Sequence, residues 1–195
     1  MRIGTLLDAV RTRLDSWLGE PTRDQSGTSV TILYRFESEI PPVRRLRLKV
    51  EIHTREHFAV YGHVMRPVTV ASRWFNGRAD IRSYELDELL ATKLRALYQR
   101  RRGRDLFDLW EASRRARVDP ARVVAAFHAY LKAEGIRVTR AEFERNLAAK
   151  ARDRAFLGEV RPMLAPGLDY DPRAALDLVR QEIAERLPGA RWKGR

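Results

Sequence analysis

The first part of the chain changes from helical to strand-like spacing of its apolar residues. A repeat of three or four positions, typical of a helix, links Ile3, Leu6, Leu7, Val10, Leu14 and Leu18. This helix is expected to end near Gly19 and Pro21, and residues 21–29 are expected to form a turn or loop. Residues 29–36 are rich in β-branched and aromatic side chains, which predicts a strand.

The next segment alternates strictly from Arg45 onward, which predicts a half-buried strand over 43–52. One face carries Leu46, Leu48, Val50 and Ile52, and the other carries Arg45, Arg47, Lys49 and Glu51. Short strands also fit within 66–75 and 79–84. A charged sheet face flanked by helices is a common way to build a cleft.

Beyond Tyr84 the apolar spacing becomes helical. Helices are expected over 85–100, 104–116, 119–132, 139–150, roughly 151–160 and 172–187. Their predicted N-caps include Asp119, Thr139 and Asp171, and Thr139 with Glu142 has the spacing of a capping box. The pattern predicts an α/β (α+β) fold with a small mixed β-sheet flanked by helices, followed by a C-terminal helical bundle. We expect residues 1–83 to form the α/β region and residues 84–195 the helical region.

Composition adds a strong positive charge. The formal net charge is +12, which favours polyanionic partners such as nucleotides, RNA, DNA or anionic membrane, although a general preference for arginine explains it equally well. The chain has no cysteine, which excludes disulfides and thiolate metal sites and fits a reducing cytoplasm. No segment is apolar for long enough to span a bilayer, so we expect no membrane association and a cytoplasmic protein.

One lysine interrupts an apolar stripe. On the helix expected over 85–100, positions 86, 89, 90, 93, 94 and 97 share a face, and they hold five leucines and Lys93. Burying an ammonium without a partner costs several kcal/mol. Lys93 is therefore expected either to extend to the edge of the stripe or to face an anion.

Carboxylates occur in two places that suit phosphate chemistry. Asp105 and Asp108 lie one turn apart at the start of a helix, where an ordinary early acid and a surface ion pair of Asp108 with Arg104 would also explain them. Lys49 and Glu51 share the charged strand face. Phosphoryl transfer with Mg²⁺ uses hard oxygen ligands together with cations that neutralise phosphates. The pair His53 and His57 lacks a matching third ligand, which argues against zinc.

Two segments together resemble the nucleotidyltransferase-like toxins of the AbiEii/AbiGii family, within the DNA polymerase β-like superfamily. They read LRLKVEIHTRE and YELDELLATKLRALYQRRRGRDLFDLW, and the resemblance covers roughly Val43 to Trp110. The family's strand motif Lys-x-(Asp/Glu) matches Lys49 and Glu51, its helical lysine matches Lys93, and its motif Arg-Asp-x-x-Asp matches Arg104, Asp105 and Asp108.

The resemblance implies roles for these residues. Lys93, Asp105 and Asp108 would be catalytic, nucleotide would be bound by Lys49, Lys93 and Arg104, and Glu51 would ligate the metal. The implied cofactor is Mg²⁺ and the implied substrate is an NTP. The family's first motif, Gly-Ser followed by Asp-x-Asp, has no counterpart in this sequence, so we expect the chain to begin inside the family pattern.

The implied activity is transfer of a nucleoside monophosphate (NMP) from an NTP to RNA, including tRNA, or to a protein. Such an enzyme would act as a toxin in abortive phage defence, restrained by a cognate antitoxin. Two alternatives stay open. One is a truncated, catalytically incomplete module that binds nucleotide or RNA, and the other is a helical interaction protein that binds no nucleotide.

Overall fold

The computed structural model describes residues 3–27, 29–53, 58–73 and 75–194. The chain divides into two compact units, Met1–Phe58 and Ala59–Arg195, which are described separately below. The domain boundary expected between residues 83 and 84 stays a prediction.

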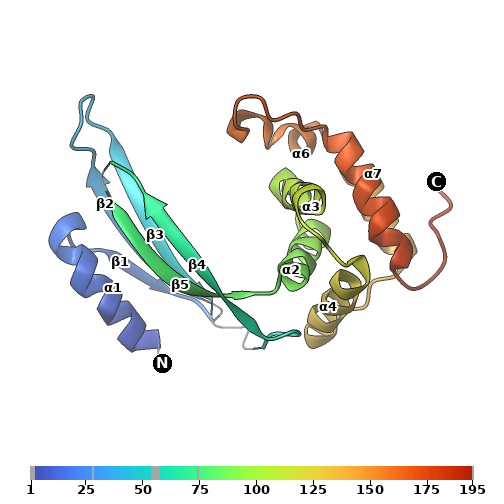
Figure 1. The fold of residues 1–195 in the computed structure, drawn as a ribbon, viewed down its shortest axis with the longest axis horizontal. Coiled ribbons are helices and arrows are strands. Elements are labelled where there is room, and N and C mark those ends of the chain that lie inside the picture. The colour runs from blue at the N-terminus through green and yellow to red at the C-terminus, as the bar shows by residue number, and fades with distance from the viewer. Residues whose placement is uncertain (1–2, 28, 54–57, 74, 195) are drawn as a thin grey trace. The chain divides into compact units, whose positions relative to one another are not determined.

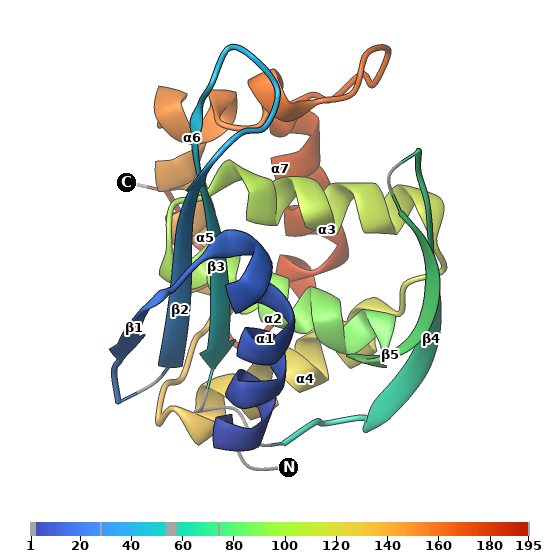
Figure 2. The same ribbon diagram turned by 90° about the vertical axis from the view of Figure 1, so that its left-hand side faces the viewer.

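The N-terminal unit is a helix on a three-stranded antiparallel sheet. It contains α1 (Ile3–Leu18), β1 (Thr22–Gln25), β2 (Ser29–Glu37) and β3 (Arg45–His53), with the strand order β1-β2-β3. The register places Val30 opposite Ile52 and Ile32 opposite Val50, so that the apolar residues of both strands share one face. Helix α1 lies across the sheet (Figures 1 and 2).

Burial in this unit follows the two predicted periodicities. Leu7 and Leu18 of α1 are buried against the alternating residues Val30, Ile32 and Tyr34 of β2. The Tyr34 hydroxyl donates a hydrogen bond of 2.7 Å to Asp15 Oδ1 on the facing helix. Burial, followed by the hydrogen bond and charge of Asp15, raises the pKa of Tyr34 to about 12.

Strand β1 corrects the loop expected over residues 21–29. Its four residues, Thr22–Gln25, pair with β2, but all of them are exposed. A short polar edge strand carries no alternation of apolar residues, so periodicity could not identify it.

The C-terminal unit begins with a β-hairpin. Strands β4 (His63–Ala71) and β5 (Asn76–Tyr84) pair antiparallel and extend further than the short strands expected there. The α/β (α+β) class is confirmed. The expectation of one small mixed sheet needs a correction in detail. The described strands pair antiparallel and form two separate sheets.

Helices make up the rest of this unit. They are α2 (Leu86–Gln99), α3 (Gly103–Arg115), α4 (Pro120–Ala133), α5 (Arg140–Lys150), α6 (Arg154–Gly158) and α7 (Pro172–Glu182), with 3₁₀ turns at Arg161–Met163 and Ala184–Arg186. The predicted caps are confirmed: Asp119, Thr139 and Asp171 accept backbone N–H groups, and Thr139 with Glu142 forms the capping box. Helix α6 is shorter than the helix expected over 151–160, because Asp153 caps its start.

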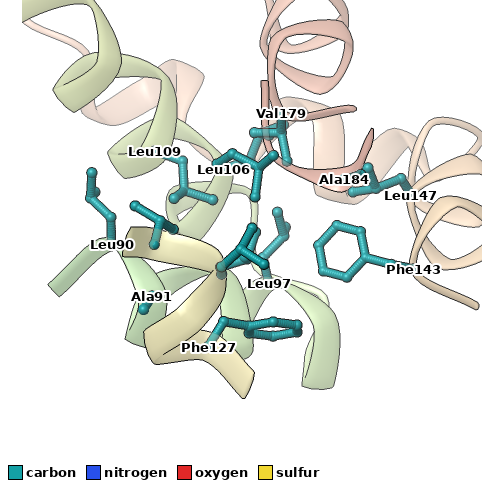
Figure 3. Packing of buried hydrophobic residues seen from close by; sticks show 14 of the residues in the cluster. Leu90, Ala91, Leu97, Leu106, Leu109, Phe127, Phe143, Leu147, Val179 and Ala184 are labelled. Carbon is teal, nitrogen blue, oxygen red and sulfur yellow. The ribbon is translucent and has the colours of Figure 1, made fainter. Parts of the chain in front are cut away.

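One apolar core joins these helices. Figure 3 shows Leu90, Ala91 and Leu97 of α2 together with Leu106 and Leu109 of α3, and side chains from α4, α5 and α7 complete the cluster. Helices α2 and α3 are therefore fixed along their inner faces, which positions the residues on their outer edges. Among the described residues, no helix is long and apolar enough to cross a membrane.

Candidate functional site

Lys93 lies at the margin of the buried face of α2. Glu88, Leu90, Ala91, Leu94 and Leu97 are the buried residues of this helix. Leu89 is 37% exposed and the Lys93 side chain is 40% exposed. The buried face is thus rotated around the helix axis relative to the predicted leucine stripe. This rotation leaves Lys93 at the boundary between core and solvent.

The anion that Lys93 faces is Asp108. Lys93 Nζ lies 2.7 Å from Asp108 Oδ2, so the pair joins α2 to α3. The spacing of Arg104 and Asp108 suggested a different ion pair, but Arg104 is exposed and Asp108 is bound to Lys93. Because both partners are about 40% exposed, the pair contributes about 1 kcal/mol or less to stability. A charged pair that is accessible and energetically inexpensive to open suits ligand exchange.

Asp105 is buried and held on both oxygens by Arg100. Arg100 Nε donates to Asp105 Oδ2 at 2.7 Å, and Nη2 donates to Oδ1 at 2.8 Å. Asp105 has no exposed surface, whereas the Arg100 side chain is about half exposed. The hydrogen bond to Asp105 raises the pKa of Arg100, and the charges of Asp105, Glu159 and Asp108 add to this despite partial burial. Asp105 therefore anchors Arg100 at the turn between α2 and α3.

The turn itself depends on Gly103. Gly103 is buried at the start of α3, and its N–H donates to Glu159 Oε2. A Cβ atom at this position would lie 2.3 Å from the carbonyl oxygen of Phe156. The backbone of α3 thus approaches α6 more closely than any side chain permits, which explains a glycine between arginines.

A second basic residue lies beneath this turn. Lys150 of α5 is buried and its Nζ donates to Asn146 Oδ1, while Asn146 Nδ2 donates to the Tyr98 carbonyl at 3.1 Å. Burial and, to a lesser extent, the charge of Arg101 lower the pKa of Lys150 to about 8, against the opposing charge of Asp105. Sequence reasoning missed this lysine because it ends a helix, where a basic residue is ordinary.

Glu88 is a buried carboxylate that the sequence analysis also missed. It accepts the N–H groups of Val60 and Tyr61 at 2.6 and 2.9 Å, and the Tyr130 hydroxyl at 2.6 Å. These bonds join the segment before β4 to α2 and α4. Little in the sequence indicates this role. Glu88 is not one of the six positions of the predicted apolar stripe, yet the helix buries it.

Lys49 and Glu51 lie on β3 of the N-terminal unit. Lys49 Nζ is 2.7 Å from Glu51 Oε2, and both side chains are partly exposed. The strand pairing places both residues on one face, as the alternation predicted. Lys93, Arg104, Asp105 and Asp108 belong to the C-terminal unit. The six candidate residues therefore form two groups, one in each unit.

The candidate carboxylates are not gathered into a cluster of metal-binding side chains in the part of the chain that the structure describes. No group of three or more histidine or acidic side chains suited to metal binding occurs among residues 3–27, 29–53, 58–73 and 75–194. Each candidate carboxylate already has a basic partner: Glu51 has Lys49, Asp105 has Arg100 and Asp108 has Lys93. We therefore assign no metal-ligand geometry. Of the two histidines considered for zinc, His57 and the His53 side chain lie outside what the structure describes.

Comparison with known proteins identifies the family. The model of the family described as nucleotidyl transferase AbiEii toxin, type IV TA (toxin–antitoxin) system, matches residues 2–179. No curated protein and no solved structure matches the chain. The match spans the candidate residues of both units and confirms the resemblance seen around Lys49, Lys93 and Asp105. The chain therefore belongs to the AbiEii family of nucleotidyl transferase toxins of type IV toxin–antitoxin systems.

Proposed function

We propose that this protein transfers a nucleoside monophosphate from an NTP to RNA, including tRNA, or to a protein, and that Lys93 binds the phosphates of the NTP. The single observation that carries the proposal is the accessible ion pair of Lys93 with Asp108, with 2.7 Å between Nζ and Oδ2. Family membership supplies the reaction class. The family's toxin–antitoxin system implies a cognate antitoxin as partner, and a role in phage defence is part of the proposal.

Lys93 suits this role because its ammonium is held without being buried. Its side chain is 40% exposed, so a phosphate can reach Nζ from solvent. In the unliganded protein Asp108 keeps the ammonium extended between α2 and α3. A triphosphate carries more charge than one carboxylate, so it replaces Asp108 as the partner of Lys93. Arg104, exposed on the first turn of α3, is proposed to bind the same phosphates.

Asp105 acts in this proposal through Arg100. Both of its oxygens accept hydrogen bonds from the guanidinium and the residue has no exposed surface, so it orients the turn and does not touch substrate. The Arg100 side chain is about half exposed, and the charge of Asp108 helps to raise its pKa. The two acids of the motif thus have different roles in the proposal: Asp105 orients Arg100, and Asp108 binds the ammonium of Lys93.

The proposed reaction forms a bond between an acceptor oxygen and the α-phosphorus of the NTP. The bond from the α-phosphorus to the bridging oxygen of the β-phosphate breaks, pyrophosphate leaves, and the acceptor proton passes to solvent. Negative charge grows on the leaving pyrophosphate, and the Lys93 ammonium stabilises that charge. Mg²⁺ is expected from the family resemblance, which also implies Glu51 as its ligand and Lys49 as a further nucleotide contact.

A transfer assay tests this function. Each NTP labelled on its α-phosphate is incubated with total RNA or with a protein extract, with and without Mg²⁺. We expect label to enter one acceptor class, and Lys93→Ala to abolish the transfer. The matched control is Lys132→Ala, because Lys132 is an exposed lysine on α4. Transfer at an unchanged rate by Lys93→Ala would contradict the proposal.

The same assay separates the alternative of a catalytically incomplete binding module. The net charge of +12 supports this alternative, because a strongly basic protein binds polyanions without catalysing a reaction. NTP binding that depends on Lys93, without transfer to either acceptor class, would support a binding module over an enzyme.

A further inference from the structure

The C-terminal tail builds two open clefts with α5 and α7. The tail follows α7 (dark red in Figure 1). A cleft of about 750 Å³ lies between α5, α7 and residues 190–194, and a second of about 480 Å³ lies between α5 and residues 192–194. Trp192 and Lys193 line both clefts. None of the residues assigned to the proposed transfer reaction lines either cleft.

The tail is anchored by backbone hydrogen bonds. The Trp192 N–H donates to Glu144 Oε2 at 2.7 Å, and the Pro188 carbonyl accepts from the Arg140 N–H at 2.8 Å. Glu144 is 6% exposed and also binds Arg140. Burial raises the pKa of Glu144, but the bonds from Arg140 and Trp192, with the charges of Arg140 and Arg191, outweigh it and lower the pKa overall. Glu144 is thus ionised and holds the tail at neutral pH.

The smaller cleft is positively charged. Arg145, Arg152 and Lys193 line it, and no acidic side chain does so among the residues that the structure describes. The larger cleft adds Arg180 and Arg191, and its two acids are already bound: Asp177 lies 2.8 Å from Arg180, and Glu144 holds the tail. Trp192 is half-buried and lines both clefts together with these cations.

We propose that this surface binds a single-stranded polynucleotide. A polynucleotide combines phosphates with flat bases, and the clefts combine guanidinium and ammonium groups with an indole ring. Stacking of a base on an aromatic ring strengthens binding and is tolerant of sequence, because every base has a flat face. Arginine and lysine neutralise the flanking phosphates and release counterions. A duplex keeps its bases stacked on one another, so it cannot use Trp192 in this way.

An acidic protein segment is the competing occupant. It would use the same cations, but it would gain little from the aromatic ring of Trp192. The dependence of binding on Trp192 therefore distinguishes the two ligands.

The test measures binding of fluorescent oligouridylate and oligothymidylate to the full chain by anisotropy, in the absence of NTP and over a range of salt. We expect Arg145→Ala with Arg152→Ala to weaken binding and to flatten the slope of log affinity against log salt by about 1.4, from about 0.7 for each phosphate contact. Trp192→Ala is expected to weaken binding about tenfold, and Trp192→Phe to retain most of the affinity. The tighter of the two probes identifies the polynucleotide.

Two controls keep the proposal falsifiable. Arg13→Ala with Lys132→Ala removes the same charge from exposed positions outside the clefts, and it should leave binding nearly unchanged. Equal weakening by both pairs of substitutions, or equal competition by polyglutamate, would overturn the proposal. Because no NTP is present, failure of this test leaves the proposed transfer reaction intact, and failure of transfer leaves this surface intact.

Discussion

Arg100 encloses the carboxylate of Asp105, donating to its two oxygens at 2.7 and 2.8 Å across the turn that joins α2 to α3. Since Asp105 has no exposed surface, the guanidinium is the group that makes its burial tolerable. This pair fixes the start of α3 and, with it, the position of Asp108.

Removing Arg100 should therefore destabilise the protein. We expect Arg100→Ala to lower the free energy of unfolding by about 2–3 kcal/mol, less than for a fully enclosed pair because Arg100 is half exposed. Arg100→Lys should recover only part of this loss, because an ammonium cannot bind both oxygens in a planar fork. Urea denaturation measures the effect. Arg104→Ala, at an exposed position on α3 next to Asp105, is the control and should stay within about 0.5 kcal/mol of the wild type.

The close approach at Gly103 gives a second prediction. Gly103→Ala places a Cβ 2.3 Å from the Phe156 carbonyl oxygen, so the backbone must move, at an expected cost of about 1–3 kcal/mol. Gly158→Ala is the matched control, because nothing lies within 4 Å of a Cβ there and the residue is helical. That substitution should be neutral or stabilising by about 0.5–1 kcal/mol. Equal midpoints of thermal unfolding for the two variants would refute the steric account.

Glu88 supplies a third prediction. Replacing it by glutamine removes one acceptor oxygen from a site with three donors, the N–H groups of Val60 and Tyr61 and the hydroxyl of Tyr130. We expect a loss of about 2–3 kcal/mol, because a buried donor is left without a partner. Tyr130→Phe removes the hydrogen bond from the tyrosine hydroxyl to Glu88 and should cost about 1 kcal/mol. Chemical denaturation of both variants checks the order, and a larger loss for Tyr130→Phe would contradict it.

The buried Lys150 predicts a dependence of stability on pH. Burial lowers its pKa to about 8 from 10.5, so between these values the unfolded chain binds more protons than the folded protein. The cost of burying the charge is fully present below about pH 8 and is relieved as the pH rises towards 10.5. Lys150→Met should therefore stabilise the protein more at neutral pH than at about pH 10. The measurement is the difference in urea midpoint from the wild type at the two pH values, with Lys132→Met as the control. A difference independent of pH would show that Lys150 titrates normally.

Local sequence signals predicted the elements well. Helix α1, strands β2 and β3 and the caps at Asp119, Thr139 and Asp171 follow from spacing and from side chains that bind their own backbone. These features depend on neighbours in the chain. Strand β1 escaped detection because it is polar and depends on its pairing with β2.

The sequence suggested candidate residues for the site, and these stay predictions, but it did not show the partners of their side chains. Spacing placed Lys93 among leucines, yet the helix buries Glu88 and exposes Leu89, because neighbouring helices decide which edge of a stripe is covered. Spacing also favoured Arg104 as the partner of Asp108, whereas Lys93 reaches it from another helix. The roles of Arg100 and Lys150 could not be predicted, because they depend on how the turn between α2 and α3 packs near α5 in the folded protein.

Nucleotide binding by Lys93 is the central claim, and calorimetric titration of each NTP tests it most directly. Loss of one charge-assisted hydrogen bond of about 1.5–3 kcal/mol predicts about 10- to 100-fold weaker binding of at least one NTP to Lys93→Ala. Asp108→Asn should instead tighten binding, because it removes the carboxylate that competes with phosphate for Nζ. Lys132→Ala should match the wild type. Unchanged NTP affinity in Lys93→Ala, or no NTP binding by the wild type, would contradict the account.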